Sequence, residues 1–323
     1  MTHIRQSKQL KQSKQSKQSR QPGRSGRSRR PGDNATLRRA LRREVPSTVG
    51  ILADEQDFTR MRRYRTFAFD DYPTYLKQCE RLLKTLSAQQ LHTSVALFDP
   101  DEFAEYCAEA GIDADTPAGR SRFTAELAGR GPSVPYTGRP LTGLLPELVN
   151  RTVRQATWEY ATLLLADLGV CADCGQDIGS AAFERASRIL MRLLELAGPG
   201  EHHVVCSVPG PDEQLLAVLH AHGGPSSTAQ IDATEGTEFV TVLAAGIALE
   251  GSGGMVLRTS APGTPDHLHG WRLHQGRLDP LTAGEVFSAY CTDAATGDPL
   301  SPEPGVEYCA GFPVTTDDPD SHH

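Results

Sequence analysis

Residues 149–198 constrain the fold more than any other stretch, because they predict two apolar helices joined by a short turn. In the second helix, apolar residues recur at three- and four-residue steps and charged residues take the opposite side, as in an amphipathic helix. Gly198 and Pro199 end it. The first helix, from Val149 to Leu168, carries apolar side chains on more than one face, so we expect it to be buried on two sides. We expect flanking strands to pack against this central helix pair.

The turn between the two helices is a candidate zinc or thiol site. It reads CADCGQD, with Cys171 and Cys174 separated by two residues, and this spacing resembles half of a zinc site. His202 and His203 follow the second helix and would supply the two further ligands. A second interpretation is that the two cysteines form a redox-active thiol pair. We favour two loop cysteines without a ligand, because no second Cys/His pair of similar spacing follows, and we therefore expect no cofactor, with zinc as the alternative.

Charge divides the chain into two parts of opposite sign. Residues 1–43 hold fourteen Lys and Arg against one Asp, a net charge of +13, and the remainder holds nineteen basic and thirty-nine acidic residues, a net charge of −20. Residues 6–20 are close to a triplet repeat of Lys, Gln and Ser with almost no apolar side chain, so we predict a disordered basic arm over residues 1–60. Translation from Met61 would remove this arm, and the sequence leaves both starts open.

The arm is a candidate nucleic-acid interface. Its cations would neutralise phosphates through residues 1–43, which gives salt-dependent binding without sequence preference. The remainder of the chain is strongly acidic and provides no second surface that would bind a polyanion. This disfavours the nucleic-acid hypothesis. The regularly spaced cations of the arm are Lys8, Lys11, Lys14, Lys17 and Arg20.

The folded part is predicted to belong to the α/β or α+β class, with a small βαβ unit, the central helix pair and a β-rich carboxy-terminal part. The small α/β unit covers residues 61–130, in which strands over residues 65–69 and 93–98 flank a helix that starts near Tyr72. A crossover between parallel strands of this kind is right-handed. Cys79 falls on the apolar face of that helix and is expected to be a core residue.

A Gly- and Pro-rich segment over residues 129–140 is the predicted boundary between two domains. The second domain is predicted to be an α+β domain over residues 141–314 built on the helix pair, followed by a loose tail over residues 315–323. Within it, the leucines after Glu213 predict a helix, and the apolar run Phe239–Leu249 predicts a strand.

Three acidic side chains at predicted strand ends form a candidate magnesium or phosphoacceptor cluster. Asp70 and Asp71 follow the first predicted strand and Asp99 follows the second, at the carboxyl ends where open α/β sheets bind ligands. Asp99 also precedes Pro100 and a helix, so capping is the interpretation we favour for it.

The cysteine pattern and the motifs that the sequence lacks limit the possible functions. We find no apolar run long enough for a membrane span and no signal peptide, and the odd number of thinly spread cysteines is unlike a disulfide scaffold, so we expect a cytoplasmic protein with reduced thiols and no membrane contact. No nucleophile elbow, nucleotide fingerprint or metalloprotease motif is present. We therefore favour a non-catalytic interaction or regulatory protein whose acidic body binds a protein partner or a small ligand and whose arm is optional. The alternatives are a zinc- or thiol-dependent enzyme that uses Cys171 and Cys174, and nucleic-acid binding by the arm.

Overall fold

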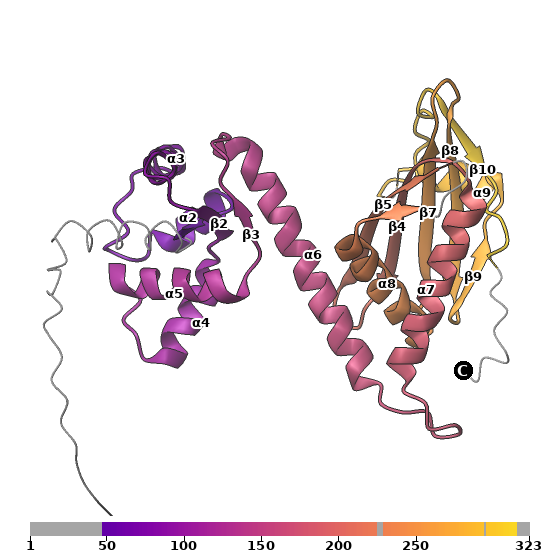
Figure 1. Ribbon diagram of the computed structural model, residues 1–323, viewed down its shortest axis with the longest axis horizontal. Helices are drawn as coiled ribbons and strands as arrows, with labels where there is room; N and C mark the ends of the chain where they lie inside the picture. The colour runs from indigo at the N-terminus through magenta and orange to yellow at the C-terminus, as the bar shows by residue number, and fades with distance from the viewer. Residues whose placement is uncertain (1–46, 225–228, 294, 315–323) are drawn as a thin grey trace, which may run out of the picture. The chain divides into compact units, whose positions relative to one another are not determined.

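The computed structural model describes residues 47–224, 229–293 and 295–314 (Figure 1). The basic arm up to residue 46 and the predicted loose tail over residues 315–323 lie outside them. The described chain combines helices with two sheets, which confirms the predicted mixed α/β class. No helix in this part of the chain has the length and apolar character needed to cross a membrane.

A small parallel unit forms the beginning of the described chain. Its sheet has, within the described residues, the strand order β1-β2-β3, in which β1 and β2 are parallel and β2 and β3 are antiparallel. The elements, in chain order, are β1 (Ser47–Ile51), α2 (Glu55–Met61), α3 (Tyr72–Ala88), β2 (Thr93–Leu97), α4 (Pro100–Ala110), α5 (Pro117–Arg130) and β3 (Ser133–Pro135). The predicted second strand and the helix after Asp71 are confirmed.

The first strand lies earlier than we predicted. Residues 65–69 are not a strand, and β1 begins at Ser47, inside the segment that we had assigned to a disordered arm ending at residue 60. Phe67 and Phe69 suggest a strand in the sequence, but in the structure their rings pack within a loop. The centroids of the two rings are 4.9 Å apart, and the centroids of the Phe69 and Tyr75 rings are 5.2 Å apart. Aromatic residues are enriched in strands, but burial against other rings stabilises them equally well in a loop.

Capping explains where the helices of this unit begin. Asp71 accepts a hydrogen bond from the backbone N–H of Thr74 at 2.6 Å and begins α3. Asp99 accepts hydrogen bonds from the N–H groups of Asp101 and Glu102 and begins α4, with Pro100 in the first turn. These carboxylates satisfy backbone donors that a helix cannot pair by itself. The prediction that Asp99 is a cap is confirmed.

The central helix pair is confirmed as α6 (Leu141–Asp167) and α7 (Ile178–Ala197). However, α6 begins eight residues before the predicted start at Val149, and its early leucines belong to the core of the small parallel unit. Farther along, Ala161 and Leu165 belong to the carboxy-terminal core. The expectation that α6 is buried on two sides is wrong for its middle, where 58% of Val153 is exposed.

The carboxy-terminal sheet has, within the described residues, the path β10-β8-β7-β4-β5-β6, with β9 paired to β8 as the seventh strand. Its neighbours are antiparallel except for the parallel pair β10 and β8. Helices α7 and α8 cover one face of it (Figure 1). The elements are β4 (Gly200–Pro209), β5 (Gln214–Gly223), β6 (Gln230–Ile231), α8 (Ala233–Ala248), β7 (Gly253–Ser260), β8 (Asp266–His274), β9 (Arg277–Pro280), α9 (Ala283–Tyr290) and β10 (Val306–Cys309).

Two elements of this carboxy-terminal part differ from the prediction. The leucine-rich segment after Glu213 is the strand β5, which forms a hairpin with β4, and not a helix. Its buried residues alternate with residues that face away from the core, among them the exposed Leu216 and the polar His220 and His222. The apolar run Phe239–Leu249 falls within helix α8 and its end, and not in a strand. Asp232 begins α8 by accepting hydrogen bonds from the N–H groups of Thr234 and Glu235.

Candidate functional site

A groove of about 430 Å³ lies at the carboxyl ends of β1 and β2. Ala53, just after β1, and Phe98 and Asp99, just after β2, line its sheet side. Helices α4 and α5 supply further walls, and Thr152 and Gln155 of α6 supply another. The groove therefore lies at the carboxyl ends of a parallel strand pair, where ligands bind in many α/β proteins.

Carboxylates dominate the charged lining of this groove, which we call the acidic groove. Among the described residues that line it, seven are acidic and Arg130 is the one basic residue. Arg130 already forms an ion pair with Glu126 at 2.6 Å, so it neutralises part of the lining only. The seven acidic residues are Asp57, Asp99, Glu102, Glu105, Glu109, Glu126 and Glu159.

Helix α4 presents three of these carboxylates on one side. Glu102, Glu105 and Glu109 are separated by three and four residues, which places them along one face of the helix. Phe103 and Cys107 point into the core on the other side. No ion pair is formed by the three glutamates within the described residues, so their negative charge is available to a ligand.

The floor of the acidic groove is aromatic and apolar. Phe98 and Phe123 meet edge to face with ring centroids 5.0 Å apart, and Tyr106 contacts Phe123 at 5.5 Å. All three side chains line the groove. Aromatic faces attract cations, and they also bury the alkyl stems of long basic side chains.

The pKa values of two groove carboxyls are raised. Partial burial is the largest cause for Asp57, and the neighbouring carboxylates Asp54 and Asp99 add to it. Burial is also the largest cause for Glu102, followed by the charges of Asp99 and Glu105. Like charges at close range disfavour the ionised form, so a bound cation would relieve this repulsion.

Of the predicted cluster Asp70, Asp71 and Asp99, only Asp99 lines the groove. Asp71 caps α3, and Asp70 precedes it in the loop. Hydrogen bonds from Thr74 lower the pKa of Asp71, in agreement with its role as a cap. Within residues 47–224, 229–293 and 295–314, no group of three or more His, Cys, Asp or Glu is arranged to hold a metal ion.

The proposed zinc ligands lie in different environments. Cys171 is buried and Cys174 is exposed in the turn between α6 and α7. His202 and His203 are consecutive in β4, so their side chains point to opposite faces of the sheet. The ring of His202 is engaged at both nitrogens: Nε2 lies 2.9 Å from the Gly198 carbonyl and Nδ1 lies 3.0 Å from the Thr259 hydroxyl.

The tautomer of His202 follows from these partners. The carbonyl can only accept, so Nε2 donates to Gly198, and in a neutral ring Nδ1 then accepts from the Thr259 hydroxyl. Burial lowers the pKa of His202, which also favours the neutral form. The side chain thus serves as a structural link between β4 and β7.

The arm residues Lys8, Lys11, Lys14, Lys17 and Arg20 lie outside the described residues. The sequence interpretation recognised Asp99 and missed the acidic groove, because its seven carboxylates come from four separate helices and a loop position. One local signal was available. The spacing of Glu102, Glu105 and Glu109 predicts an acidic helix face, whereas Glu102 alone was read as part of a helix start.

Comparison with protein families gives one match. Residues 36–139 match a domain of unknown function (DUF8829). The matched part covers less than half of the chain and includes every strand of the small parallel unit together with α2, α4 and α5, which line the acidic groove. No curated protein matches the chain, and no solved structure does. The acidic groove thus lies largely in the part of the chain that is similar to DUF8829.

Proposed function

We propose that the folded body is a non-catalytic interaction protein that binds a Lys- or Arg-rich segment of a protein partner in the acidic groove. The observation that carries this proposal is the composition of the groove lining, with seven carboxylates, one Arg that is already paired and an aromatic floor. A cytoplasmic location is part of the proposal, supported by the odd number and wide spacing of the cysteines.

The size and chemistry of the groove favour a peptide segment over a single ion. A volume of about 430 Å³ accommodates several side chains, and pockets of this size bury organic ligands. The carboxylates along α4 are spaced over two helical turns, so successive basic side chains of one segment would each meet a glutamate. The partly exposed ring of Tyr106 would receive the alkyl stems or the guanidinium planes.

Removal of three groove charges is expected to weaken the binding of a basic peptide. A fluorescein-labelled hexa-arginine peptide titrated with the intact protein in a fluorescence anisotropy assay should bind the variant Glu102→Gln/Glu105→Gln/Glu109→Gln about tenfold more weakly than the wild type. This corresponds to roughly 0.5 kcal/mol for each exposed charge pair. The affinity should also fall as salt is raised, because salt screens exposed charges.

A matched control removes the same charge elsewhere. Glu184, Glu195 and Glu213 are exposed residues of the carboxy-terminal domain that do not line the groove. Their triple change to Gln should leave the affinity close to that of the wild type. Equal losses in the two triple variants would show that net charge alone attracts the peptide, and the proposal would then be wrong.

The raised pKa values add two checks to the same experiment. Lowering the pH should weaken peptide binding, because burial and neighbouring carboxylates raise the pKa values of Asp57 and Glu102, which therefore take up protons at a higher pH than ordinary carboxyls. Their folded-state pKa values lie above the unfolded ones, so ionising them opposes folding at neutral pH. Glu102→Gln is therefore not expected to lower the unfolding temperature, and lost affinity in this variant would not come from unfolding.

A further inference from the structure

Helix α6 contributes to two cores, one toward each of its ends. Leu144 and Leu148 pack in the core of the small parallel unit, and Ala161 and Leu165 pack in the carboxy-terminal core. The intervening turns leave Val153 largely exposed. Polar contacts must therefore contribute to fixing this segment.

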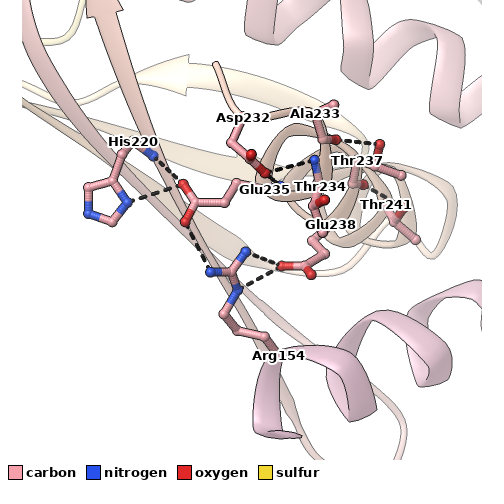
Figure 2. Close-up of polar contacts among 9 residues, drawn as sticks. All are labelled: Arg154, His220, Asp232, Ala233, Thr234, Glu235, Thr237, Glu238 and Thr241. Carbon is pink, nitrogen blue, oxygen red and sulfur yellow. Dashed lines mark hydrogen bonds and ion pairs between the residues drawn. The ribbon is translucent and has the colours of Figure 1, made fainter. Parts of the chain in front are cut away.

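Arg154 makes such contacts with α8 (Figure 2). Its Nε donates to Glu238 Oε2 at 2.7 Å, its Nη2 lies 2.5 Å from the same oxygen, and its Nη1 donates to Glu235 Oε1 at 3.0 Å. The side chain of Arg154 is only 26% exposed, that of Glu238 18% and that of Glu235 19%. Guanidinium contacts of this forked kind are stronger than single exposed ion pairs.

Glu235 links the same cluster to the sheet. Its second oxygen, Oε2, accepts from the backbone N–H of His220 at 3.0 Å and lies 3.2 Å from the ring Nδ1 of His220 (Figure 2). These hydrogen bonds and the charge of Arg154 outweigh burial and lower the pKa of Glu235. The carboxylate therefore joins three elements, α6, α8 and β5.

The groove lies on the opposite side of the same helical segment. Thr152, Gln155 and Glu159 of α6 line the acidic groove and are spaced by three and four residues, so they share one face. Arg154 is two residues from Thr152, which corresponds to about 200° around the helix axis at 3.6 residues per turn. One stretch of α6 thus carries a groove wall on one face and the ion-pair cluster on the other.

We infer that Arg154 is a positioning residue for the acidic groove, because its contacts with Glu235 and Glu238 fix the α6 wall against the carboxy-terminal domain. The predicted effect on ligand affinity rests on the proposed function, whereas the positioning of α6 does not. Coupling of this kind is reciprocal, so peptide binding in the groove should in turn hold α6 more firmly in this position.

Hydrogen exchange tests the positioning role without any ligand. In the intact protein, Arg154→Ala should speed amide exchange across residues 149–160 about tenfold and leave β2 unchanged, since local opening differs from global unfolding. Arg154→Lys, which keeps the charge but loses the fork, should have a smaller effect. The control is Arg192→Ala, which breaks an equally short but exposed ion pair with Glu195 at 2.6 Å and should change nothing in this segment.

Peptide affinity tests the link to the groove. Arg154→Ala should bind the hexa-arginine peptide about fivefold more weakly than the wild type. The direction of the change in affinity is decisive. If only charge mattered, removal of a positive charge would make the surroundings of the groove more negative and strengthen the binding of a cationic peptide. Unchanged exchange over residues 149–160 would overturn the positioning role. Faster exchange with unchanged or tighter peptide binding would overturn the link. If the wild type binds no peptide, the proposed function fails while the exchange measurement still decides the role of Arg154.

Discussion

A chain that starts at Met61 is expected to lose the folded core of its small parallel unit. The deletion removes β1, the parallel neighbour of β2, and nearly all of α2. Ile51, Leu52 and Phe58 are at most 3% exposed, and burying each contributes about 1.5–3 kcal/mol. With the β1 hydrogen bonds, this loss is comparable to the 5–15 kcal/mol that stabilises a typical domain. Amide exchange at Val95 and Ala96 in β2 should accelerate to the rate of an unfolded chain.

The matched control is a chain that starts at Pro46, which lacks the basic segment but keeps β1 and α2. Its unfolding midpoint in urea and its exchange at β2 should equal those of the full chain. If the chain from Met61 unfolds at the same midpoint and keeps β2 protected, then β1 is dispensable, and the sequence-based boundary at residue 60 was the better one.

Gly246→Val is expected to destabilise the carboxy-terminal domain by about 3 kcal/mol. Gly246 lies in α8, where an added Cβ would meet Val208 Cγ1 at 2.5 Å and Leu273 Cδ2 at 2.7 Å. Both neighbours are buried strand residues, so the helix or the sheet would have to move. Urea unfolding followed by tryptophan fluorescence would report this directly, since Trp271 lies in β8 within the same core.

The sign of this effect distinguishes the helix from the strand that the sequence predicted. In an extended segment, Gly→Val would favour the structure, because β-branched residues stabilise strands. Gly143→Val in α6 is the control, since a Cβ there meets nothing within 4 Å and the change should stay within about 0.5 kcal/mol. A Gly246→Val protein as stable as the Gly143→Val protein would contradict the packing of α8 against β4 and β8.

Local signals predicted much of the fold. The apolar spacing of α7 and the cap at Asp99 depend on neighbouring residues only, and the structure confirms them. A capping box of Thr282 and Glu285, which the sequence also encodes locally, begins α9. Such features are encoded within one or two helical turns, so a single sequence suffices to find them.

The errors arose where long-range packing decides the structure. A continuous apolar run such as Phe239–Leu249 is compatible with a buried strand or a buried helix, and the packing of α8 against α6, α7 and the sheet selects the helix. In β5, the leucines fit a helical spacing as well as an alternating one, and pairing with β4 selects the strand. The acidic groove was missed for a related reason, because Asp57, Glu126 and Glu159 come together only in the folded chain.

Photo-crosslinking tests the central claim most directly, because it shows where a cation binds on this acidic protein. A hexa-arginine peptide with a benzophenone group, crosslinked to the intact protein and mapped by mass spectrometry, should label α4, α5 and the middle of α6, with Tyr106 and Phe123 among the nearest residues. The variant Glu102→Gln/Glu105→Gln/Glu109→Gln should lose most of this labelling. Crosslinks spread evenly over the acidic surface, or confined to the carboxy-terminal sheet, would contradict the account.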